Sequence, residues 1–257
     1  MKFNRGLVLL FVFLGFSIAR GGDILFQASA INALMQGVYD GTMTFGELGR
    51  HGDFGIGTVN ALDGEMIAVD GRFYQALSNG KVVPIPAGMK TPFAEVTNFH
   101  AQQRHSLEMV KSFAELQRAL DGMISSKNLF YAIKVTGTFS TIKFRSVERQ
   151  RPPYRLLVDI VKTQSEFTLH NVRGTLVGFR CPPFVSGMNV PGYHFHFITD
   201  DKSKGGHVLD CVIQNARIEL DALSDMQMVL PKNRQFLNVD LSGKAEAALK
   251  TVEQGTR

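Results

Sequence analysis

Apolar residues recur at helical spacing in two segments of the chain. The first lies between Ser29 and Gly41, and its apolar face consists of Ile31, Leu34, Met35 and Val38. The second begins at Ser112 and Glu115, which have the spacing of a capping box, and its apolar face consists of Phe113, Leu116, Leu120 and Met123. Both patterns predict short amphipathic helices, and we expect the second to pack against a sheet.

Most of the remaining apolar residues form short runs separated by turn residues. Between His51 and Val83 the runs alternate with Gly and with Asp-Gly or Asn-Gly pairs, which predicts a meander of strands joined by tight turns. In the second half of the chain, strand-like runs occupy residues 129–135, 138–144, 155–160, 166–172, 174–179, 193–198 and 207–216. The polar stretch from Arg149 to Pro153 predicts a break between two sheet units.

These elements predict an α/β fold of the α+β kind, with two mixed or antiparallel sheet units and a few helices. A boundary near residue 160 gives an N-terminal sheet domain over residues 20–160 and a C-terminal sheet domain over residues 161–257. After Leu237 the chain becomes a polar tail, and its weak helical stretch at 244–252 has too few apolar residues to fold alone. We expect this tail to lie on the main body or remain mobile, and its removal to change stability little.

The first residues have the layout of a signal peptide. Lys2 and Arg5 precede an apolar run that ends in the small residues Ser17 and Ala19, so we expect cleavage of residues 1–19 and export to the periplasm or the cell exterior. The run is shorter than the ~20 apolar residues that span a bilayer. An uncleaved membrane anchor is the alternative, and after cleavage we expect no membrane span.

Composition and charge place the chain among ordinary globular proteins. Hydrophobic residues make up 44% and charged residues 20% of the sequence. Loss of Lys2 and Arg5 with the leader lowers the formal net charge from +5 to +3. The remaining Lys and Arg residues are scattered, so we expect no nucleic-acid partner. Cys181 and Cys211 match no redox or zinc motif, which leaves either one disulfide or two buried free thiols.

Three histidines are the strongest candidates for chemistry. His194 and His196 alternate on a predicted strand, so both imidazoles point to the same side. The Gly-ended connection that follows predicts a hairpin, which would return His207 beside them. Three neutral nitrogen ligands with an open position are typical of a catalytic zinc site. The alternative is a half-exposed pair without metal, and the remaining histidines, His51, His100, His105 and His170, share no spacing and are expected on the surface or in the core.

The spacing of these histidines does not choose the reaction. A zinc hydratase, a cupin-type oxygenase and a metal-dependent lyase can all use such a set. A cupin usually has a Glu shortly after the paired histidines, whereas this sequence has Thr199, Asp200 and Asp201.

A longer motif indicates which reaction to expect. The run from Asn189 to Asp201, followed by Gly205 to Asp210, resembles the metal-binding signature of bacterial alpha-acetolactate decarboxylases. Further segments resemble the same family and extend the resemblance over essentially the whole mature chain: His51–Thr58, Leu62–Glu65, Asp70-Gly71, Phe73-Tyr74, Thr91–Ala94, Asn128–Ile133, Arg145–Val147 and Pro153-Tyr154. The hydrophobic leader is the main departure, because many members lack it.

The resemblance implies decarboxylation of (S)-2-acetolactate to (R)-acetoin and carbon dioxide. It implies that His194, His196 and His207 bind Zn²⁺ in the C-terminal sheet domain. It also implies that Glu65, Arg145 and Glu253 complete the catalytic site, that the tail folds back over the zinc, and that the chain forms a homodimer. Without the resemblance, those last three residues would be interpreted as solvated surface charges. The rival functions are a secreted three-histidine zinc hydratase or hydrolase and a non-catalytic exported module that binds metal.

Overall fold

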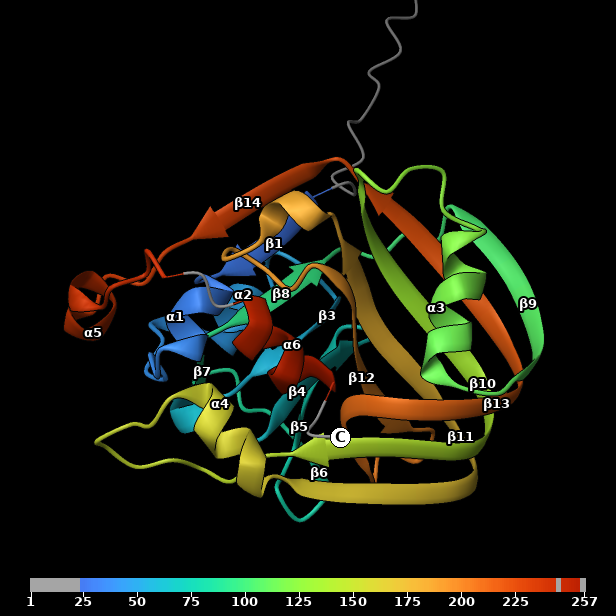
Figure 1. Cartoon of the computed structure of the whole chain (residues 1–257), viewed down its shortest axis with the longest axis horizontal. Helices are drawn as coiled ribbons and strands as arrows, with labels where there is room; N and C mark the ends of the chain where they lie inside the picture. Colours follow the sequence, from blue (N-terminus) through green and yellow to red (C-terminus); the bar gives the residue numbers. More distant parts are fainter. Residues whose placement is uncertain (1–23, 244–245, 255–257) are drawn as a thin grey trace, which may run out of the picture.

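Figure 1 shows the chain as a computed structural model, which describes residues 24–243 and 246–254. The predicted signal peptide, residues 1–19, lies outside the described residues. Two large sheets face each other across a shared core, and short helices lie around them. The predicted α+β class, with two mixed or antiparallel sheet units and few helices, is confirmed.

The first large sheet is mixed. Among the described residues it contains seven strands, in the spatial order β14 (Asp225–Val229), β1 (Ile24–Ala28), β8 (Ala94–Thr97), β3 (Phe54–Thr58), β4 (Glu65–Val69), β5 (Arg72–Ala76) and β6 (Val82–Pro84). Its strand pairs are antiparallel except for β1 and β14, which are parallel. The predicted meander between residues 51 and 83 is present as β3, β4, β5 and β6.

The second large sheet is strongly curved (Figure 1). Its five strands in the described chain are, in order, β10 (Phe130–Ser146), β11 (Ser165–Cys181), β12 (Gly192–Thr199), β13 (Gly205–Leu223) and β9 (Gln103–Val110). Strand β10 pairs with both β11 and β13 over most of its length, so four of the strands form a closed cycle of pairings. Each large sheet contains strands that precede residue 160 in the sequence and strands that follow it.

The helices and small elements are short. They are α1 (Ile31–Met35), α2 (Phe45–Leu48), α3 (Phe113–Asp121), α4 (Leu157–Ile160), α5 (Arg234–Asn238) and α6 (Glu246–Gln254), with the strand pair β2 (Met43–Thr44) and β7 (Lys90–Thr91) and 3-10 turns at Asn60–Leu62, Val161–Thr163 and Pro183–Val185. The two predicted amphipathic helices are present as α1 and α3. The side chain of Ser112 accepts a hydrogen bond from the Glu115 N–H and caps α3, but the Glu115 carboxylate accepts from the Lys111 N–H, so only the Ser112 half of the predicted capping box forms.

One predicted strand, residues 155–160, is wrong. The segment ends in α4, and the apolar residues Leu157, Ile160 and Val161 are buried together in one cluster. Their spacing of three and four positions is that of a helical face, which a run of only six residues did not reveal.

The C-terminal helix α6 packs on the main body. Leu249 and Val252 are 5% and 2% exposed and belong to the same apolar cluster as α1 and α4. The tail therefore folds back, as expected. The helix buries two large apolar side chains, so from the structure we expect its removal to lower stability, in contrast to the expectation from the sequence.

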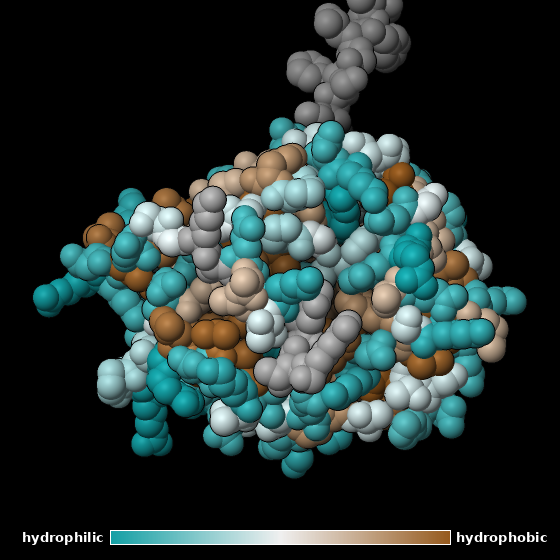
Figure 2. Space-filling view, in the orientation of Figure 1, coloured by the Kyte–Doolittle hydropathy of each residue, from teal (hydrophilic) through white to brown (hydrophobic). Residues whose placement is uncertain are grey.

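No helix within the described ranges is long and apolar enough to cross a bilayer. Hydrophilic residues make up most of the face that carries α6, with smaller hydrophobic patches between them (Figure 2).

Candidate metal centre

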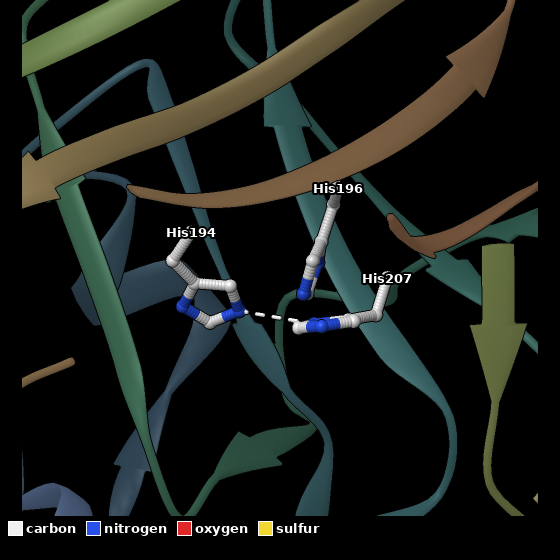
Figure 3. A group of neighbouring side chains, drawn as sticks. All are labelled: His194, His196 and His207. Carbon is white, nitrogen blue, oxygen red and sulfur yellow. Dashed lines mark hydrogen bonds between the residues drawn. The ribbon is translucent and has the colours of Figure 1, made fainter. Parts of the chain in front are cut away.

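Two neighbouring strands bring the three histidines together. His194 and His196 alternate on β12, so their rings leave the strand on the same side. The β12–β13 hairpin sets His207 directly opposite His196 in the register. Figure 3 shows the three rings pointing toward one another. Their nearest ligand atoms all lie within 4.8 Å of one another, a spacing that could hold a metal ion.

Hydrogen bonds fix which nitrogen atom of two rings is free to bind a metal. His196 Nδ1 lies 2.8 Å from the carbonyl oxygen of Met66, and His207 Nε2 lies 3.0 Å from that of Glu253. A carbonyl oxygen can only accept, so each of these nitrogens carries the proton. The lone pairs therefore lie on His196 Nε2 and His207 Nδ1, and His207 Nδ1 is 3.2 Å from His194 Nε2.

Burial keeps all three imidazoles neutral. His194, His196 and His207 are 8%, 1% and 2% exposed. Burial lowers the pKa of His194 to about 3 and holds the pKa of His196 and His207 well below the usual value, and the nearby Arg145 guanidinium lowers all three further. Neutral imidazole is the form that binds a metal ion.

Glu65 and Arg145 reach the histidines from different sheets. Glu65 begins β4 in the seven-stranded sheet, whereas Arg145 lies near the end of β10 and pairs with His207 in the register. Arg145 Nη1 lies 3.4 Å from Glu65 Oε1, and Glu65 Oε2 lies 3.7 Å from His196 Nε2. Arg145 Nη2 donates to the carbonyl oxygen of Val252 at 3.1 Å. Both charged side chains are buried beside the imidazoles.

Glu253 enters from the last turn of α6. Its Oε2 atom lies 3.6 Å from His194 Nε2 and 3.9 Å from His207 Nε2, and it has no hydrogen-bond partner among the described residues. Burial raises the pKa of Glu253 and of Glu65 to about 7, although Arg145 lowers both. Each carboxyl can therefore change its protonation state near neutral pH.

The six candidate side chains enclose a small cavity. Its volume is about 40 Å³, and its apolar wall is formed by Ile31, Leu34, Leu62, Phe93, Val147, Leu157 and Val252. A second cavity, of about 850 Å³, lies beside α6 and shares Glu253 with the first. Glu253 is thus the carboxylate that lines both spaces.

Sequence reasoning missed one carboxylate near the histidines. Glu95 lies on β8, is 0% exposed, and its Oε1 atom is 3.9 Å from His194 Nδ1. Asn189 donates to Glu95 Oε2 at 2.7 Å. Burial raises the pKa of Glu95 to about 8 against this hydrogen bond. The one available signal was a charged residue inside the apolar strand that follows Pro92.

The other histidines and the cysteines lie outside this cluster. His51 stacks on Phe26, His105 contacts Gln103 and His170 contacts Thr141, and none of these histidines belongs to the group of potential metal ligands in the described chain. Cys181 and Cys211 are buried free thiols. The structure thus resolves the choice between a disulfide and two thiols.

Comparison with known proteins gives one consistent family. The family model described as alpha-acetolactate decarboxylase matches residues 25–243, which include five of the six candidate residues but not Glu253. A Methanosarcina mazei protein of that name is 48% identical over 90% of this chain and 81% of its own length. A Methylococcus capsulatus protein of that name is 48% identical over 89% of this chain and 88% of its own length.

A solved structure agrees. The crystal structure of alpha-acetolactate decarboxylase from Bacillus subtilis strain 168 superposes with a TM-score of 0.88 at 38% identity, covering 91% of this chain and 100% of the other.

Proposed function

The chain belongs to the alpha-acetolactate decarboxylase family and is a carboxy-lyase that decarboxylates acetolactate, and from this premise we propose that it uses a Zn²⁺ ion held by His194, His196 and His207. The observation that carries the proposal is the convergence of three buried, neutral imidazoles whose hydrogen bonds direct two lone pairs toward one point. No observation favours the hydratase or binding-module alternatives.

The residues fit a zinc ion on two counts. His194 Nε2 and His207 Nδ1 are 3.2 Å apart, and two nitrogen ligands of one tetrahedral zinc lie about 3.3 Å apart when each bond is about 2.0–2.1 Å. In addition, Glu253 Oε2 and Arg145 Nε are buried without hydrogen-bond partners in the described chain. Buried polar atoms are almost always paired, so these two atoms favour a polar ligand at this position.

The reaction requires the chain to orient one carboxylate and to deliver one proton. The bond between the carboxylate and the tertiary carbon breaks, its electron pair enters the adjacent ketone as an enediolate, and a proton then adds to the same carbon to give acetoin. Zinc supplies Lewis-acid stabilisation of the negative charge that develops on the substrate oxygens.

Arg145 is suited to hold the substrate. Its Nη atoms contact Glu65 and the Val252 carbonyl, whereas Nε has no partner in the described chain and can donate to a substrate oxygen. The two fixed contacts hold the plane of the guanidinium in one orientation. We propose that this donor orients the carboxylate that leaves.

Glu253 is suited to deliver the proton. Arg145 favours the ionised form of both carboxyls, but Glu65 is held in an ion pair with it, whereas the Glu253 carboxyl makes no hydrogen bond in the described chain. A pKa of about 7 leaves part of the Glu253 population protonated at neutral pH. Delivery from one side alone would give one enantiomer, and the resemblance to the family supports (R)-acetoin from (S)-2-acetolactate.

The test is turnover of racemic 2-acetolactate with chiral analysis of the acetoin formed, alongside zinc content, in alanine variants at His194, His196 and His207. We expect each variant to lose zinc and turnover. Alanine variants at His100 and His105 are the controls and should keep both. Equal losses in all five variants would contradict the assignment.

We also propose that residues 1–19 direct export and are then removed, and that the mature chain forms a homodimer. The basic, apolar and small-residue order of the leader supports the first proposal. The resemblance to the family supports the second.

A further inference from the structure

A buried carboxylate of the first sheet faces a histidine of the second. Glu95 is 0% exposed on β8, and His194 lies on β12. Glu95 Oε1 and His194 Nδ1 are 3.9 Å apart, and neither atom has a hydrogen-bond partner among the residues that the structure describes. An acceptor and a ring nitrogen are thus buried face to face, each without another hydrogen bond in this part of the chain.

A chain of hydrogen bonds fixes the role of the other Glu95 oxygen. Gln27 Nε2 donates to the carbonyl oxygens of Ser29 and Met188, both at 2.7 Å. Since carbonyls only accept, Gln27 Oε1 is the end that faces Asn189, and Asn189 Nδ2 donates to it at 2.8 Å. The same Nδ2 donates to Glu95 Oε2 at 2.7 Å. Oε2 is therefore an acceptor with a fixed partner, and Oε1 is left to face His194.

The other two histidines already have the acceptor that a metal ligand needs. The carbonyl oxygen of Met66 accepts from His196, and that of Glu253 accepts from His207. A histidine that ligates a metal almost always donates its second ring N–H to such an acceptor, which fixes the tautomer and the direction of the lone pair. Glu95 is the group positioned to do this for His194.

We propose that Glu95 is a positioning residue of the metal site, whose carboxylate accepts the Nδ1–H of His194 and so directs the Nε2 lone pair of that ring toward the zinc ion. The inference rests on the proposed zinc site. A ring and carboxylate shift of about 1 Å brings the pair to the length of a charge-assisted hydrogen bond. The divalent cation on the far side of the ring favours the ionised carboxylate.

A purely structural role explains the carboxylate poorly. The two groups that donate to the buried Glu95 carboxylate, Asn189 and the Cys181 thiol, both donate to Oε2, so the carboxylate carries a large desolvation cost, and an amide oxygen could accept from both equally well. An amide in that orientation, however, would turn its NH₂ group toward His194. Two donors would then oppose each other, and His194 would be driven to the tautomer that carries its proton on Nε2 and cannot bind the metal there.

The experiment is a zinc competition titration against a chelator of known affinity, on the full mature chain. It compares wild type, Glu95→Gln, Glu95→Ala and His194→Ala, with thermal unfolding of each metal-free protein. Gln27→Leu is the matched control, because it breaks the same buried network at a residue that does not face His194. We expect both Glu95 variants to bind zinc about 10- to 100-fold more weakly than wild type. Gln27→Leu should bind it as wild type does, even where its unfolding temperature falls.

A double-mutant cycle separates action through His194 from a general effect of charge. In the His194→Ala background, Glu95→Gln should change zinc affinity by less than about threefold, because the ring that it positions is gone. Wild-type affinity in both Glu95 variants, or an equal loss in Gln27→Leu, would overturn the role of Glu95 and leave the zinc site standing. Zinc affinity unchanged by His194→Ala would contradict the zinc site itself and the inference with it.

Discussion

Helix α6 contributes to stability and to catalysis through different atoms, so two perturbations should separate the two effects. Deleting residues 244–257 removes the buried side chains of Leu249 and Val252 and also the Glu253 carboxyl. Glu253→Gln removes only the carboxyl. The main-chain carbonyls of residues 252 and 253, which accept from Arg145 and His207, are lost in the first variant and kept in the second.

The stability cost of the deletion follows from the burial. Full burial of a Leu or Val side chain contributes about 1.5–3 kcal/mol, so docking of α6 is worth up to about 3–6 kcal/mol from these two residues. That is a large share of the roughly 5–15 kcal/mol that stabilises a typical domain. We expect the deletion to lower the unfolding temperature clearly and to weaken zinc binding, because His207 loses the acceptor of its Nε2–H.

The substitution should lower turnover without loosening the fold. Glu253→Gln has the same shape, so zinc content should stay near that of wild type and the unfolding temperature should not fall, while acetoin production should fall about 100-fold with the loss of a positioned acid. Leu249→Ala is the control for loosened packing, with an expected stability loss of about 2–5 kcal/mol and turnover within a few-fold of wild type.

Steady-state acetoin formation, zinc content and thermal unfolding decide the outcome. Near-normal turnover in Glu253→Gln would refute the proton-donor assignment. An unchanged unfolding temperature in the deletion variant would refute the packing argument.

The remaining predictions concern the guanidinium, pH and processing. Arg145→Lys keeps the charge, but a lysine cannot reach both Glu65 and the Val252 carbonyl, so turnover should fall about 100-fold. The circular dichroism spectrum should not change. Unchanged kinetics would show that Arg145 is dispensable. Burial raises the pKa of Glu253 from 4.5 in the unfolded chain to about 7 in the folded protein, so wild type loses stability as the pH rises from 4.5 to about 7. In denaturant titrations of metal-free protein, Glu253→Gln should therefore gain stability relative to wild type over the same pH range. A stability difference between the two proteins that does not change with pH would contradict the burial of Glu253 as a neutral acid. Mass spectrometry of secreted protein should find Arg20 at the N-terminus, and an intact Met1 would refute cleavage.

The histidine cluster was predictable because its geometry is local. Residues two positions apart on a strand share a face, and a short hairpin fixes where the next strand returns. The clustering of His194, His196 and His207 therefore follows from their spacing. The same local reasoning fails for α4, where three apolar residues in a short segment do not distinguish a strand from one helical turn.

The remaining site residues come from elements that only the tertiary fold brings together. Glu65, Arg145 and Glu253 lie on the first sheet, the second sheet and the last helix, and no residue pattern links them, so the family resemblance alone indicated them. Glu95 has no motif of its own. Its burial opposite His194 depends on the packing of β8 against β12, which no window of sequence records.

Acetoin formation from 2-acetolactate by metal-free and zinc-restored protein tests the central claim most directly. We expect the chelated enzyme to form no acetoin above the uncatalysed rate, and about one zinc ion per chain to restore turnover, because the three histidines form a single site. Full turnover in protein shown to contain no metal would contradict the account.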